Sequence, residues 1–151
     1  MNTTSSDTLK IKLLTETAFL PTRGTPDSAG LDLYADLFSP VWIYPHETVK
    51  IGTGIAIQLP QGTFGGLYAR SGLAAKWGVA PANCVGVIDA DYTGEVIVAL
   101  HNNASAGAIE ISPGERIAQL IVQPYIPLTV EITDDLTSTQ RGDGGFGSTG
   151  A

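Results

Sequence analysis

Two carboxylates and a tyrosine stand directly after a short apolar run. The run covers residues 85–88, and it continues as Asp89-Ala90-Asp91-Tyr92. A run of this kind is typical of a buried strand, which would deliver the polar side chains to a turn at its end. A carboxylate held there can act as a general base that activates water. The alternative is an Asx-type turn, in which both aspartates only accept hydrogen bonds from backbone N–H groups.

A second candidate is an anion-binding site around Arg70, Ser71 and Gly72. These residues follow the apolar run 64–69 and open the one segment with helical character, 71–77. We expect Ser71 at the helix N-cap, where free backbone N–H groups and the neighbouring arginine favour a phosphate. Plain helix capping by the serine is the alternative interpretation.

Two further charged residues lie in apolar segments. Asp32 alternates with leucines, and Arg116 begins a largely apolar run. A buried carboxylate needs a partner, so we predict that Asp32 pairs with Arg116. The alternative is that Asp32 points to solvent.

From Arg141 onward the chain is rich in glycine and contains Phe146 and Ser148. Successive backbone N–H groups in such a segment can wrap an anion, and Arg141 and Ser148 would add hydrogen bonds to it. Phe146 has no apolar neighbour there, which fits an aromatic side chain that stacks on a flat ring when the arm closes. Residues 145–150 match the dinucleotide fingerprint G-x-G-x-x-G, but too few residues follow for the helix that this fingerprint requires. A disordered tail without function is the alternative.

Strands must position these candidates. Short apolar or alternating segments recur between turn signals, which is typical of an all-β sandwich or barrel. The expected strands are residues 10–14, 30–35, 41–44, 54–59, 64–69, 85–88, 95–101, 108–111, 116–122 and 128–132. The only expected helix is 71–77. Apolar periodicity stops after Asp135, so we expect one domain with an all-β sandwich or barrel core over 1–135 and a glycine-rich arm over 136–151.

Composition limits the classes of function. The 151 residues carry a net charge of −7, which argues against a broad nucleic-acid-binding surface. Arg70, Arg116 and Arg141 nevertheless stand close to glycines, as expected for local binding of a small anion. Cys84 is the only cysteine, so no internal disulfide can form. Because the N-terminus lacks a signal-peptide pattern and no apolar run approaches about 20 residues, we expect a cytoplasmic protein without a membrane span.

Five segments resemble, in order and spacing, the five motifs of the trimeric dUTP pyrophosphatases (dUTPases). They are Ala29-Gly30-Leu31-Asp32-Leu33, Arg70-Ser71-Gly72-Leu73, Gly86-Val87-Ile88-Asp89-Ala90-Asp91-Tyr92-Thr93-Gly94, Gly114-Glu115-Arg116-Ile117-Ala118-Gln119-Leu120 and Arg141-Gly142-Asp143-Gly144-Gly145-Phe146-Gly147-Ser148-Thr149-Gly150. The resemblance implies a jelly-roll-like distorted β-barrel with a flexible C-terminal arm, and a homotrimer whose active sites are shared between subunits. It also implies hydrolysis of dUTP to dUMP and pyrophosphate, which keeps uracil out of DNA and supplies dUMP for dTMP synthesis. Mg2+ would be held by the substrate phosphates and water, with no direct protein ligand.

The resemblance further implies roles for single residues. Asp89 would deprotonate the water that attacks the α-phosphorus. Tyr92 would lie under the deoxyribose and leave no room for a ribose 2'-OH. Asn83 would pair with the uracil edge, together with nearby strand backbone. Asp32 would position Arg116 and the hydrated metal.

The remaining implied contacts go to the phosphates and the base. Arg70, Ser71 and Gln119 would contact the phosphate chain. Arg141 and Ser148 would hold its γ end, while Phe146 would cover the uracil. The full set of expected substrate-binding residues is Arg70, Ser71, Gly72, Asn83, Gly86, Val87, Ile88, Tyr92, Gln119, Arg141, Phe146, Gly147 and Ser148.

Two other functions compete with this one. A dCTP deaminase of the same fold would attack the base instead of a phosphorus atom, although the Asp89 and Tyr92 arrangement matches the dUTPases better. A regulatory protein would use the fold to sense a nucleotide or to bind a protein partner. Release of ammonia from dCTP, or recovery of a partner that dUTP displaces, would distinguish them.

Overall fold

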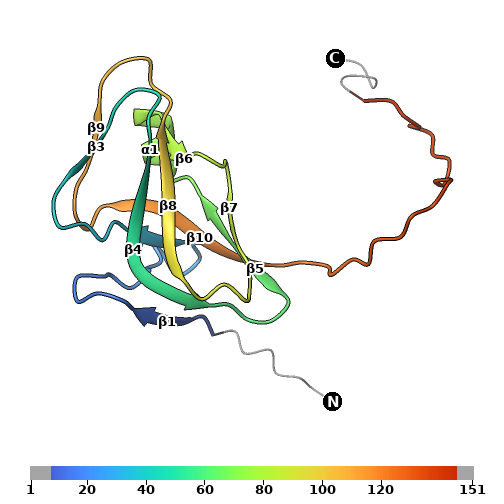
Figure 1. Ribbon diagram of the computed structural model, residues 1–151, viewed down its shortest axis with the longest axis horizontal. Helices are drawn as coiled ribbons and strands as arrows, with labels where there is room; N and C mark the ends of the chain where they lie inside the picture. The colour runs from blue at the N-terminus through green and yellow to red at the C-terminus, as the bar shows by residue number, and fades with distance from the viewer. Residues whose placement is uncertain (1–7, 146–151) are drawn as a thin grey trace.

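A computed structural model describes residues 8–145 of the chain. Within these residues it contains ten strands and one short helix (Figure 1). The elements are β1 (Lys10–Leu13), β2 (Leu31–Tyr34), β3 (Val41–Ile43), β4 (Thr48–Gln58), β5 (Thr63–Tyr68), α1 (Ser71–Trp77), β6 (Val79–Pro81), β7 (Gly86–Ile88), β8 (Glu95–Asn102), β9 (Ile109–Ile111) and β10 (Arg116–Pro124).

Two antiparallel four-stranded sheets enclose an aliphatic core. One sheet has the strand order β1-β4-β8-β6, the other has β2-β10-β5-β7, and β3 and β9 form a separate ribbon. In β8 every second side chain from Val96 to Leu100 is fully buried, because successive residues of a strand point to opposite faces. The all-β, jelly-roll-like class with one short helix is therefore confirmed.

The largest error in the predicted strands concerns residues 128–132. No strand follows β10 in the part of the chain that the structure describes, and Leu128, Val130 and Ile132 are 81%, 91% and 95% exposed. Figure 1 shows the chain leaving the barrel after β10, so this segment has no neighbouring backbone with which to pair. The short strand β6 was not predicted, and β4 begins well before the predicted start at residue 54.

The helix α1 has the predicted bounds but not the predicted cap. Arg70 occupies the N-cap with an extended backbone (φ −85°, ψ 130°) and without a side-chain capping bond. Its carbonyl accepts a hydrogen bond from the N–H of Ala74 at 3.0 Å. Ser71 is thus the first helical residue, and its predicted capping role is wrong. The helix ends at Gly78, whose φ of 70° is left-handed and favours glycine.

No helix among residues 8–145 has the length and apolar character needed to cross a membrane.

Candidate active site

A pocket of about 230 Å³ lies along β7, between its edge and the start of β8. The strand β7 stands at the edge of its sheet and pairs with β5, so that Gly86 lies opposite Leu67 and Ile88 opposite Gly65. Six residues of the expected site line the pocket, namely Asn83, Gly86, Val87, Ile88, Asp89 and Tyr92. The structure therefore brings together the residues that the sequence assigned to base, sugar and water activation.

Asp89 follows the buried Ile88 and is exposed at the end of the strand, as predicted. The N–H of Tyr92 donates to the carbonyl of Asp89 at 3.1 Å, which closes a turn. Neither the Asp89 nor the Asp91 carboxylate bonds a side chain or a backbone N–H among the described residues, so the structure does not support the Asx-turn alternative. Asp89 also borders a larger hollow of about 1050 Å³, so its carboxylate stands where two cavities meet.

The hydroxyl group of Tyr92 is hydrogen-bonded within the protein. Its Oη donates a hydrogen bond to the carbonyl oxygen of Glu95 at 2.9 Å. The carbon atoms of the ring, and not its hydroxyl, are therefore what Tyr92 offers to a molecule in the pocket. This arrangement suits contact with a sugar better than proton transfer.

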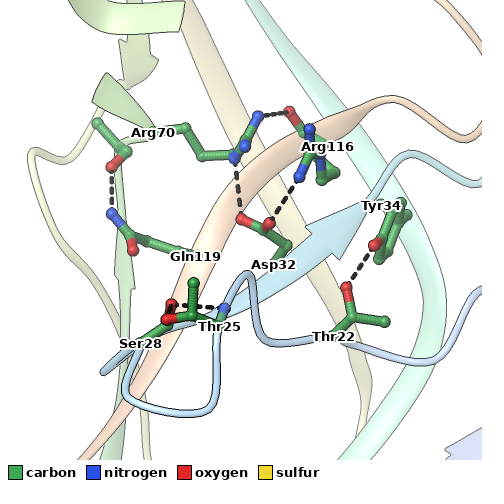
Figure 2. A network of polar contacts seen from close by, with 9 residues as sticks. Thr22, Thr25, Ser28, Asp32, Tyr34, Arg70, Arg116 and Gln119 are labelled. Carbon is green, nitrogen blue, oxygen red and sulfur yellow. Dashed lines mark hydrogen bonds and ion pairs between the residues drawn. The ribbon is translucent and has the colours of Figure 1, made fainter. Parts of the chain in front are cut away.

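A second polar cluster surrounds Asp32 (Figure 2). Its Oδ2 accepts a hydrogen bond from Arg116 Nη1 at 3.3 Å, which confirms the predicted pair. Its Oδ1 accepts one from Arg70 Nε at 2.9 Å, which was not predicted. The Asp32 side chain is only 14% exposed, so the alternative that it points to solvent is wrong. Two guanidinium groups share one carboxylate here, and the remaining positive charge favours an anion nearby.

Gln119 reaches the same cluster from β10. Its backbone lies opposite Tyr68 on one side and Asp32 on the other. Its Nε2 donates to the carbonyl of Ala69 at 2.9 Å, so the amide braces the backbone just before Arg70 (Figure 2). Gly30 makes room for this side chain, because a Cβ atom there would lie 2.5 Å from Gln119 Oε1. The phosphate contact expected of Gln119 stays a prediction.

Asp89 and the Asp32 cluster lie toward opposite ends of β5. Asp89 follows Ile88, which pairs with Gly65 near the beginning of β5, whereas Arg70 follows Tyr68 at its end. At a rise of ~3.3 Å per residue, Asp89 and Arg70 are separated by about 20 Å along the strand direction. One chain therefore does not bring its own Asp89 together with its own Arg70 and Ser71.

The other expected phosphate-binding residues are distributed as follows. Ser71 and Gly72 are exposed in the first turn of α1, next to Arg70. Arg141 is also exposed, and its Nε donates to the nearby carbonyl of Gly144 at 2.9 Å. Among the described residues Arg141 has no bond to the pocket or to the Asp32 cluster. Phe146, Gly147 and Ser148 lie outside the described residues.

Two residues that matter for the pocket had no assigned role in the sequence analysis. Glu95 holds the Tyr92 hydroxyl through its carbonyl, and its Oε1 accepts the N–H of Gly54 at 2.9 Å. Gly94 lies directly against the Tyr92 ring. No sequence signal marks these contacts: the bond of Glu95 to Gly54 depends on how β8 lies against β4, and the contacts of Tyr92 depend on the path of the turn before β8. In residues 8–145, no three His, Cys, Asp or Glu side chains cluster in a way that could hold a metal ion.

The chain is similar to known proteins over most of its length. The dUTPase family model matches residues 16–150. A deoxyuridine 5'-triphosphate nucleotidohydrolase of Orientia tsutsugamushi (strain Ikeda) is 46% identical over 134 residues, which is 89% of this chain and 90% of the relative. The corresponding protein of Hydrogenobaculum sp. is 46% identical over 142 residues, 94% of this chain and 97% of the relative.

Among solved structures, the dUTPase of Staphylococcus bacteriophage 80alpha with dUpNHpp superimposes with a TM-score of 0.87 at 29% identity, covering 97% of this chain and 100% of the phage protein. The family match, the similarity to the bacterial relatives and the shared fold extend over nearly the whole chain. The chain therefore belongs to the dUTPase family.

Proposed function

We propose that this chain hydrolyses dUTP to dUMP and pyrophosphate, with Asp89 as the base that deprotonates the attacking water. The observation that carries the proposal is the exposed Asp89 carboxylate at the edge of the pocket that Asn83 and Tyr92 also line. A carboxylate with both oxygens open can hold a water and take its proton as the oxygen attacks the α-phosphorus. The reaction would remove a precursor of uracil in DNA and supply dUMP for dTMP synthesis.

The order of residues along β7 gives the substrate a direction. Asn83 precedes the strand and Asp89 follows it, with Tyr92 in the turn beyond. A nucleotide with its uracil at Asn83 and its α-phosphorus at Asp89 would therefore point its remaining phosphates away from the Arg70 of the same chain. The positive charge of the Asp32 cluster would then serve a substrate held by another copy.

We propose accordingly that the active unit is a homotrimer with shared sites. One subunit would contribute Asp89 and the pocket, and a second would contribute Arg70, Ser71 and Gln119. The arm with Arg141 and Phe146 would close the site from a further subunit. Closed rotational symmetry repeats such a contact without leaving an open end. The exposed apolar side chains between residues 126 and 136 support assembly, because apolar surface of this extent is normally covered.

Mg2+ is the proposed cofactor, carried by the substrate. The triphosphate offers oxygen ligands of its own, and this ion usually keeps several waters when it is bound through phosphates. Its chemistry is to neutralise charge on the phosphate oxygens. Both Asp32 oxygens already accept hydrogen bonds from arginines, so Asp32 would act on the hydrated ion through that network and not as a direct ligand.

The decisive test is release of pyrophosphate by the purified protein from dUTP, compared with dTTP, dCTP and UTP. We expect turnover of dUTP alone. Asp89→Asn should keep nucleotide binding and lose about 10²- to 10⁴-fold in kcat, as removal of a general base does. Asp91→Asn is the matched control, since Asp91 borders only the larger hollow. Absence of dUTP turnover, or release of ammonia from dCTP, would overturn the proposal.

A further inference from the structure

We infer that Gly94 is a specificity-determining residue, because the missing side chain at this position fixes where the Tyr92 ring lies beside the sugar. The inference rests on the proposed role of Tyr92 under the deoxyribose. The two residues are close in sequence, and Tyr92 lines the pocket along β7. Gly94 itself touches no substrate in this account, so it acts through the tyrosine.

The need for glycine at this position is one of space. A Cβ atom on Gly94 would lie 2.6 Å from the Tyr92 Oη, 2.7 Å from Cζ and 3.0 Å from Cε2. Contacts below 3.0 Å are essentially never made by real Cβ atoms. The backbone at Gly94 is not left-handed, so an alanine would be acceptable there if the ring were elsewhere. Any side chain at position 94 must therefore displace the ring.

The ring cannot move freely, because its hydroxyl is tied to the barrel. The hydrogen bond from Tyr92 Oη ends on the carbonyl of Glu95, the first residue of β8. Glu95 lies opposite Ala56 in β4, and its side chain is anchored on the N–H of Gly54. The tip of the ring is thus held by the sheet, while Gly94 provides the surface on which the ring rests.

The position of the ring then decides how much room remains beside C2' of a bound nucleotide. A displaced ring loses its hydrogen bond to the Glu95 carbonyl and no longer packs closely against the sugar. We expect Gly94→Ala to reduce the preference for deoxyribose over ribose by about ten-fold, within the range that a single misplaced group in a pocket produces. The affinity for the deoxynucleotide should fall at the same time.

The experiment measures Kd for dUMP and for UMP by calorimetry on the assembled full chain. Gly24→Ala is the matched control, because Gly24 is exposed and a Cβ there makes only an ordinary 3.5 Å contact with Ser28 Oγ. The control should keep the wild-type ratio of Kd for UMP to Kd for dUMP, and Gly94→Ala should lower this ratio. A Gly94→Ala protein with the wild-type ratio would overturn the inference.

A double-mutant cycle covers the case in which Gly94→Ala alone fails to fold. In a Tyr92→Ala background there is no ring to displace, so adding Gly94→Ala should change neither Kd. A further loss of dUMP affinity in the double variant would contradict the inference. Wild-type turnover of dUTP is measured separately. If the wild-type protein prefers dUMP over UMP but does not hydrolyse dUTP, only the proposed function is refuted. If the wild-type protein is active and Gly94→Ala leaves the ratio of Kd for UMP to Kd for dUMP unchanged, only the role of Gly94 is refuted.

Discussion

Replacement of Asp32 by asparagine should destabilise the protein and weaken the phosphate binding proposed for the Asp32 cluster. Asp32 accepts hydrogen bonds from Arg70 Nε at 2.9 Å and from Arg116 Nη1 at 3.3 Å. Asparagine keeps the shape of the side chain, but it removes the charge and presents an NH2 group to one of the guanidinium groups. Arg70 and Arg116 would then repel each other without a carboxylate between them.

The magnitude follows from exposure. A hydrogen bond between charged groups contributes about 1.5–3 kcal/mol when it is buried, but exposed pairs contribute about 1 kcal/mol or less. The Arg70 side chain is 26% exposed and that of Arg116 is 50% exposed, so the first bond dominates. We expect a loss of about 2 kcal/mol in the free energy of unfolding. For a chain of this length that corresponds to a fall in Tm of about 4–8 °C.

Differential scanning calorimetry at a fixed protein concentration measures this change, since the proposed assembly would make Tm depend on concentration. Asp27→Asn is the control, because Asp27 is exposed and its side chain makes no hydrogen bond within residues 8–145. The kcat/KM for dUTP should fall at least ten-fold in Asp32→Asn, as its arginines lose their orientation. Equal melting temperatures and equal kcat/KM in the two variants would refute the reasoning.

Two further predictions concern the chain after β10. Deletion of the residues after Gln140 should leave Tm nearly unchanged, since the adjoining segment is exposed, yet it should remove most dUTP turnover; full activity would exclude the arm from the mechanism. Leu128→Asp combined with Val130→Asp should shift the sedimentation coefficient toward that of a monomer, because these exposed apolar side chains would be buried between subunits. Thr129→Asp, on the alternate side of the segment, should leave the sedimentation coefficient unchanged, and equal behaviour of the two proteins would contradict a role of this segment in assembly.

The features predicted correctly from sequence are those that local patterns determine. Apolar periodicity located most of the strands, and the run before Asp89 placed that carboxylate correctly at the end of β7. The pairing of Asp32 with Arg116 followed from two charges in apolar surroundings, which need partners when they are buried. The family resemblance then related these local features to a single function, the hydrolysis of dUTP.

The features that were missed depend on how the strands and turns are arranged in the folded chain. Arg70 reaches Asp32 only because β10 lies between β2 and β5, an order that the sequence does not reveal. The contact of Gly94 with Tyr92 likewise depends on the path between β7 and β8. The predicted strand at 128–132 carries a real alternation of apolar residues, but one chain offers it no partner.

The central claim, that one active site takes Asp89 from one subunit and Arg70 from another, is tested most directly by mixing two inactive variants. Asp89→Asn and Arg70→Ala proteins are unfolded, combined in equal amounts and refolded together, and release of pyrophosphate from dUTP is measured. Random assembly of a shared site would restore about a quarter of the wild-type activity, because one site in four receives both intact contributions. A mixture no more active than its two parents would contradict the account.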